Sequence, residues 1–90
     1  MAKPRMGLML AGFANALGHV CQADMVGAAK HLDQYAWLDV PPDEHLDALF
    51  RHLFAHMRGE ENPDGISHLS SVAWRALALL EIEACTEPAP

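Results

Sequence analysis

Hydrophobic residues recur at helical spacing in several stretches of the chain, and this pattern predicts an all-α fold. The clearest stretch covers residues 42–58, where apolar side chains repeat at i, i+3, i+4 and i+7. Pro42 and Asp43 are residue types that favour a helix start. The apolar stripe that we expect to be buried consists of Leu46, Leu49, Phe50, Leu53, Phe54 and Met57. No useful length of sequence alternates between apolar and polar residues as a half-buried strand would.

Two further helices are predicted over residues 6–22 and 66–84. The stripe expected to be buried on the first consists of Met6, Met9, Leu10, Phe13, Leu17, Val20 and Cys21. The stripe expected to be buried on the second consists of Leu69, Val72, Ala73, Ala76, Leu77 and Leu80. Asp24 would fall on the first stripe if that helix continued. We therefore predict a break, with Asp24 as the N-cap of a short helix over residues 24–31. The alternative is that the helix continues and the carboxylate of Asp24 is half-buried.

These elements predict one helical domain over residues 1–90, a small bundle of three to four helices with a frayed tail at residues 86–90. An apolar fraction of 51% is generous for 90 residues, because a domain of this size buries a modest share of its surface. We therefore predict a homo-oligomer that buries part of these apolar residues. Trp74 lies about 100° from the predicted buried stripe, which suggests a subunit contact.

The net charge of −6 argues against partners that require a basic surface, namely nucleic acid polymers and anionic membranes. A small anionic ligand held by a few cations stays compatible with it. Cys21 and Cys85 are too far apart in sequence to indicate a disulfide framework. The apolar stretch at residues 7–20 contains three glycines and an asparagine and is too short to span a bilayer. We expect a cytoplasmic protein.

Histidines and cations gather on two of the predicted helices. His45, His52 and His56 lie nearly in one line on the helix predicted over residues 42–58. The spacing of His52 and His56 could chelate a metal. The alternative is that they are boundary residues covering the edge of the core. His68 and Arg75 share one flank of the last helix, whose N-terminus is a natural anion site. A phosphate could lie between this flank and a neighbouring helix.

An acidic turn separates these two helices. Glu60, Glu61 and Asp64 lie within five residues, and carboxylates gathered this way suit Mg²⁺. The alternative is a solvated turn in which Asp64 or Ser67 caps the following helix.

Several short motifs follow one another in a fixed order between Gly27 and Glu83. They are Gly27-Ala28-Ala29-Lys30 followed by Trp37, the leucine-rich Arg51-His52 helix over residues 46–56, and Gly59-Glu60 followed by Asp64-Gly65-Ile66-Ser67-His68-Leu69. In order and spacing they resemble the phage family of dATP/dGTP diphosphohydrolase N-terminal domains. The resemblance covers most of the chain.

The resemblance implies cleavage of a deoxynucleoside triphosphate to the monophosphate and pyrophosphate, in the host cytoplasm during phage infection. It also implies a role for seven residues. Five of them are ligand-binding residues: Lys30, Trp37, Arg51, His52 and His68. The other two, Glu60 and Asp64, are catalytic residues that bind Mg²⁺. To the ligand-binding residues we add Arg75 from its position on the last helix.

Three functions stay open at this point. The first is metal-dependent hydrolysis of dATP or dGTP. The second is a non-catalytic sponge that sequesters nucleotide signals to counter bacterial defence, since Pro63 places the acidic motif in a turn and no second acidic motif follows. The third is an acidic protein that inhibits a host factor. A nucleotide or nucleotide-derived small molecule is the predicted partner for the first two.

Overall fold

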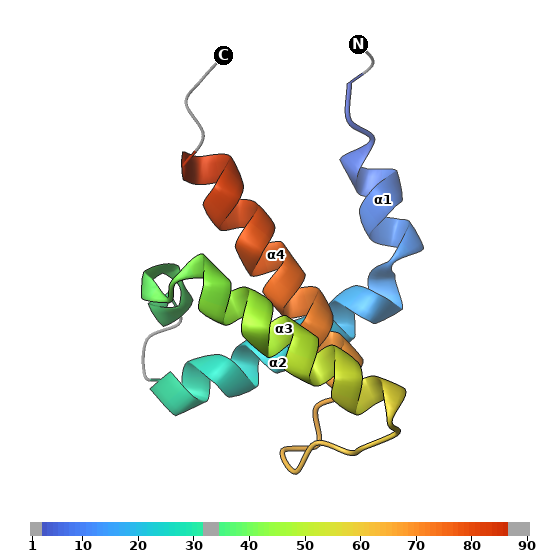
Figure 1. Cartoon of the computed structure of the whole chain (residues 1–90). Helices are drawn as coiled ribbons and strands as arrows, with labels where there is room; N and C mark the ends of the chain where they lie inside the picture. The colour runs from blue at the N-terminus through green and yellow to red at the C-terminus, as the bar shows by residue number, and fades with distance from the viewer. Residues whose placement is uncertain (1–2, 32–34, 87–90) are drawn as a thin grey trace.

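The computed structural model describes residues 3–31 and 35–86. This part of the chain contains four α-helices, one 3-10 helix and no strand, which confirms the predicted all-α class. In chain order the elements are α1 (Met6–Gly12), α2 (Ala14–His31), η1 (Ala36–Asp39), α3 (Pro42–Met57) and α4 (His68–Thr86). Figure 1 shows that α1 and α4 diverge towards the same end of the molecule, where both termini lie.

The contact between α3 and α4 is the most extensive in the fold, and α2 packs against α4 as well. In Figure 1, α3 lies nearest the viewer and crosses over α4, while α1 extends away from the other helices. The radius of gyration is 14.5 Å, compared with about 12 Å for a compact chain of this length. The arrangement is therefore open for its size.

The break in the N-terminal helical region lies at Phe13, not near Asp24 as predicted. The first helix ends at Gly12, and the second continues without interruption to His31. Glycine at the junction weakens the helix there. Asp24 does not serve as a cap, because its carboxylate Oδ1 accepts a hydrogen bond of 3.0 Å from Nε1–H of Trp74 on α4. A partner distant in sequence thus allows the helix to continue through this position.

Both ends of α3 follow from local sequence. Pro42 occupies the first turn, where its missing N–H costs nothing, and two acidic residues follow it near the positive end of the helix dipole. At the other end Gly59 adopts a φ of 73°. The amide of Gly59 donates to the carbonyl of His56, and that of Glu60 to the carbonyl of Ala55. This pair of bonds is a Schellman motif, which stops the helix.

Ser67 caps α4, as one of the two predicted alternatives had it. Its Oγ accepts a hydrogen bond of 3.1 Å from the backbone amide of Ser70 and lies 2.6 Å from the Ser70 hydroxyl. Such a cap satisfies an amide that has no partner within the helix. The helix runs on to Thr86, and the rest of the predicted frayed tail lies outside the described residues.

The inner face of α3, defined by His45, Ala48, His52 and Ala55, is the face that packs into the fold. His45, Ala48 and Ala55 are buried and His52 is half-buried. The predicted buried stripe is therefore wrong in part, since four of its members are 44–70% exposed: Leu46, Phe50, Phe54 and Met57. Small alanines let α4 approach closely, whereas a Leu or Phe on that face would hold the two helices apart.

On α4 and α1, too, apolar residues that were predicted to be buried are exposed. On α4 the buried residues are Ser70 and Ala78, while Leu69, Leu77 and Leu80 are about half exposed or more. The predicted stripe on α1 is also exposed from Met6 to Phe13. Even so, none of the described helices is both long enough and apolar enough to cross a membrane.

Candidate functional site

A pocket of about 340 Å³ lies among α2, η1, α3, the loop before α4, and α4 itself. Four of the residues predicted from the sequence to form a ligand site line it, and they come from four different segments. These residues are Trp37, His52, Asp64 and Arg75. Its volume lies within the range of small-molecule sites in proteins. The fold thus brings three of the six predicted ligand-binding residues, together with Asp64, to one place.

Two tryptophans form the aromatic wall of the pocket. The rings of Trp37 and Trp74 meet edge to face, with centroids 5.8 Å apart and an interplanar angle of 80°. Trp74 is half-buried and is anchored by its hydrogen bond to Asp24 on α2. Trp74 thus makes contacts within its own chain, because α4 turns this ring towards α2 and η1. The subunit contact suggested for it stays a prediction.

His45 is the most deeply buried large side chain described, with 0% exposure, and the prediction of a boundary residue was wrong for it. Its Nε2–H donates to the carbonyl oxygen of Trp37 at 2.8 Å, and Nη1 of Arg75 donates to its Nδ1 at 2.7 Å. A carbonyl can only accept and a guanidinium can only donate, so these two partners require a neutral ring protonated at Nε2. His45 thereby fixes both η1 and Arg75.

Arg75 projects from α4 at the centre of this arrangement. Its guanidinium lies 5.3 Å from the Trp74 ring centroid, within the range of a cation–π contact. Burial lowers the pKa of Arg75, and the positive charge of Arg51 lowers it further. Both causes indicate a half-buried cation with positive charge nearby, a setting that favours an anionic partner.

His52 and His68 approach each other directly across α3 and α4. Their Nδ1 atoms are 2.8 Å apart and the ring centroids 5.1 Å. One Nδ1 must carry the proton and the other must accept it, so at least one ring of the pair is neutral. The pKa of His52 is lowered, first by burial and then by the charges of His68, Arg75 and Arg51, with Asp64 opposing more weakly.

The predicted ligand Arg51 does not line the pocket. Arg51 is exposed and pairs with Asp47 one turn away, with Nη1 3.4 Å from Oδ2. Its charge still reaches His52 and Arg75 electrostatically. Lys30 lies in α2, but its side chain is outside the described part of the structure. His56, which by its spacing could chelate a metal together with His52, is exposed. His52 pairs with His68 and not with His56.

The two predicted Mg²⁺ ligands have other partners. Arg58 donates two hydrogen bonds of 3.1 and 3.0 Å to the carboxylate of Glu60, which lowers the pKa of Glu60. Asp64 Oδ1 accepts the backbone amide of Ile66 at 3.0 Å. Over the described residues, no group of three or more His, Cys, Asp or Glu side chains is arranged to hold a metal. The structure thus gives Glu60 and Asp64 partners within the chain, and the Mg²⁺ site stays a prediction.

Sequence reasoning missed the roles of three residues: His45, Asp24 and Trp74. The only available signal for His45 was its position in line with His52 on α3, and that line proved to be the buried side of the helix. Asp24 was noticed only because a carboxylate interrupted an apolar stripe. Its partner lies 50 residues away, and no local rule could have identified it.

The fold and pocket define a small helical domain whose site combines an aromatic wall with a cationic and imidazole cluster. The chain belongs to the family described as dATP/dGTP diphosphohydrolase, N-terminal, which it matches over residues 1–89. This agrees with the resemblance seen in its motifs. No curated protein and no solved structure matches the chain significantly.

Proposed function

We propose that this domain binds a purine deoxynucleotide in the pocket. The phosphates would lie at the end formed by Arg75, His52 and His68, and the base beside Trp37 and Trp74. The single observation that carries the proposal is the convergence of a half-buried guanidinium and an imidazole pair beside an aromatic-walled pocket. The family description supplies the choice of dATP or dGTP.

Electrostatics favours an anion at this end of the pocket. After burial, which is the main cause, three neighbouring positive groups lower the pKa of His52, and one of them also adds to the lowering of the pKa of Arg75 by burial. A bound phosphate would reverse these effects, because a nearby negative charge favours the protonated form of an imidazole. Arginine is also well suited to phosphate, since its planar fork can donate two parallel hydrogen bonds.

The other end of the pocket suits a nucleobase. Aromatic side chains can stack on the face of any nucleobase. Trp37 and Trp74 both line the pocket. Asn62, which is half-buried, lines it too. Its amide carries both a donor and an acceptor, which is the combination needed to read the polar edge of a purine.

We infer binding, and no hydrolytic step is assigned to this domain. Pyrophosphohydrolysis at a carboxylate-bound metal would need Glu60 and Asp64 as ligands, and their contacts do not provide such a set. The Mg²⁺ predicted from the sequence therefore carries no step here. Retention of a nucleotide without turnover would also suit sequestration of nucleotide signals.

The experiment combines binding with recovery of the ligand. The purified protein is titrated calorimetrically with dATP, dGTP and dTTP, with and without Mg²⁺, and the mixture is then heated and analysed by chromatography. We expect binding of the purine deoxynucleotides and recovery of intact triphosphate. Recovery of the monophosphate would instead show that the domain turns over its ligand. Absence of binding to all three would refute the proposal.

Two matched arginine variants localise the site. Arg75→Gln should weaken binding by at least roughly tenfold, the equivalent of about 1.4 kcal/mol. Arg58→Gln removes the same charge from an exposed position outside the pocket and should leave the affinity unchanged. Since Arg75 also supports His45, circular dichroism must show that Arg75→Gln is folded. If it is not, His68→Asn provides the same test from the other side of the cluster.

A further inference from the structure

We propose that the outer face of α3 pairs with the same face of a second copy of the chain, in an antiparallel manner about a twofold axis. The outer face is defined by Leu46, Phe50, Phe54 and Met57. This homodimer interface is separate from the pocket and does not depend on nucleotide binding. It rests on the shape of the apolar face, on the surface area of the chain and on the distribution of charge along α3.

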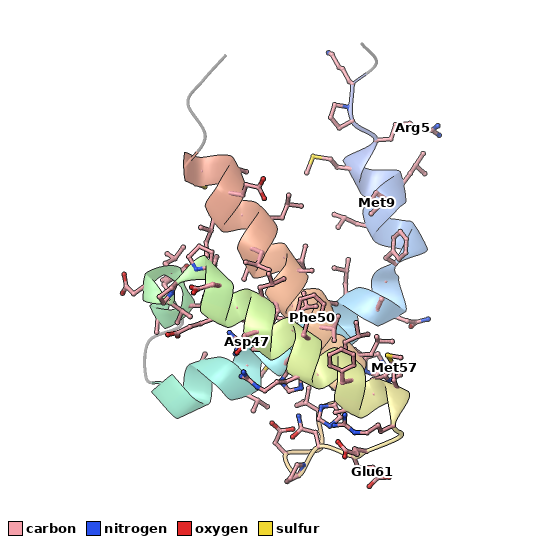
Figure 2. The ribbon with its side chains drawn as sticks, in the orientation of Figure 1. Arg5, Met9, Asp47, Phe50, Met57 and Glu61 are labelled. Carbon is pink, nitrogen blue, oxygen red and sulfur yellow. The ribbon has the colours of Figure 1, made fainter. Side chains whose placement is uncertain are left out.

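The outer face is continuous along the helix. Its four residues are spaced four, four and three positions apart, so they fall on one side of α3 over nearly its whole length of about 24 Å. The rings of Phe50 and Phe54 stack with centroids 6.3 Å apart and an interplanar angle of 24°. Phe50 and Met57 are labelled along α3 in Figure 2, and in Figure 1 no other segment crosses the outer side of this helix.

The surface area of the chain is large for its mass. The chain exposes 7173 Å², which is about 2,000 Å² more than the roughly 5,200 Å² expected for a compact monomer of its mass. The buried apolar residues of the described part are three alanines, namely Ala48, Ala55 and Ala78. Permanent dimers bury at least about 1,000 Å² per chain. The excess is large enough for such an interface, and the exposed apolar residues between Met6 and Phe13 contribute to it together with the outer face of α3.

The charges on α3 favour an antiparallel partner of the same sequence. The N-terminal half of the helix carries Asp43, Glu44 and Asp47, whereas Arg51 and, at its C-terminal cap, Arg58 follow in the second half. In antiparallel pairing the acidic half of each copy lies against the half of the other that carries the arginines, and the helix dipoles oppose each other favourably. Arg51 and Arg58 also pair within their own chain, with Asp47 and Glu60, so the dipoles and the separation of the acidic halves carry most of this preference. Parallel pairing would bring like charges together. An anionic membrane would be repelled by the net charge of −6.

The proposed geometry makes a specific prediction for cross-linking. The twofold axis passes between Phe50 and Phe54, so Leu46 of one copy lies near Met57 of the other. Two copies of Leu46 are then separated by about 11 residues of helix, or about 16 Å. A disulfide needs Cα atoms within about 7 Å. Only the mixed pair can therefore form.

This is tested with single cysteines in a background where Cys21→Ser and Cys85→Ser remove the native thiols. Leu46→Cys and Met57→Cys proteins are oxidised separately and as a mixture under mild conditions. We expect a covalent dimer in the mixture and little in either protein alone. Efficient self-linking of both single variants would show parallel pairing and overturn the antiparallel interface.

Solution mass tests the dimer itself. Light scattering on the unmodified chain at micromolar concentration should give the mass of two copies. Phe54→Arg should reduce it to one, whereas Met25→Arg, an equally polar change at an exposed methionine on α2, should not. A monomeric unmodified chain would overturn the proposal. So would binding to vesicles of acidic lipid that is abolished by Phe54→Arg, since the apolar face would then serve a membrane.

Discussion

A small helical domain usually buries the large apolar side chains of a helix and exposes the polar ones. The two faces of α3 show the reverse. The inner face buries an imidazole and two alanines against α4, while the outer face exposes the leucine, the phenylalanines and Met57. The contrast shows that apolar periodicity identifies the side chains that avoid water. It does not say whether the same chain covers them, and in a 90-residue chain it need not.

The inner face is stable despite its polarity because its groups are paired. Both ring nitrogens of His45 have partners, and the Nδ1 atoms of His52 and His68 are partners of each other. Within the described residues, no buried side-chain nitrogen or oxygen lacks a hydrogen-bond partner. A buried polar network that is fully satisfied fixes one geometry, whereas a broken one is costly. The inner face should therefore be intolerant of substitution, and the outer face much less so within a single chain.

The largest expected effect comes from His45→Ala. This change leaves a cavity, removes two hydrogen bonds and deprives Arg75 of its acceptor, so it should lower the free energy of unfolding by about 2–4 kcal/mol. Urea denaturation followed by circular dichroism measures it. Phe50→Ala on the outer face is the matched comparison, at the lowest protein concentration that gives a signal. A greater loss for Phe50→Ala under those conditions would reverse the proposed contrast between the faces.

Removal of the cap of α4 should have the next largest effect. Ser67→Ala deletes the acceptor for the Ser70 amide at the start of the helix that carries His68. The expected loss is about 1 kcal/mol of unfolding free energy, measured by the same denaturation. Ser67→Thr keeps a hydroxyl cap and should restore most of it. Equal losses for the two variants would mean that the cap does not support this end of the inner face.

A smaller effect is expected from pH. The pKa of His52 is lowered in the fold, so the unfolded chain takes up this proton at a higher pH, near its ordinary value of about 6.5. Lowering the pH through this range should therefore reduce the free energy of unfolding until the folded-state pKa is passed. Thermal unfolding at a series of pH values should show this slope, and His52→Gln should flatten it. Unchanged slopes in the variant would assign the effect elsewhere.

The smallest effect is expected at the border of the two faces. Asp47 and Arg51 form an exposed ion pair with a 3.4 Å contact. Exposed pairs of this kind contribute little, so Asp47→Ala should change the free energy of unfolding by about 0.5 kcal/mol or less. The denaturation midpoint in low and high salt measures it. A loss as large as that of His45→Ala would mean that the pair is part of a larger buried network.

Much of the fold could be predicted from the sequence because its signals are local. Pro42, Gly59 and Ser67 set helix ends through their own backbone and side-chain chemistry, and each acts where the sequence indicated. The break at Phe13, directly after Gly12, was not predicted. The sequence left open whether the helix continues through Asp24, because the answer depends on a contact between α2 and α4 that brings together residues 50 positions apart.

The site divides in a similar way. Trp37, His52, Asp64 and Arg75 were named from motifs and helix geometry, and all four line one pocket. The exposed position of Arg51 and the engagement of Glu60 by Arg58 could not be read from the chain, because a motif indicates which residue types occur and not which partners they find. The burial of His45 could not be predicted from the hydrophobic pattern, because the stripe expected to be buried contained only apolar residues.

The two tryptophans of the chain both stand at the wall of the pocket, 5.8 Å apart. The indole emission of the whole protein therefore originates at one location. A guest entering beside these rings would alter their polarity and quench or shift that light without any attached dye. The intrinsic fluorescence of the two tryptophans should therefore report, in real time, whether the pocket is occupied.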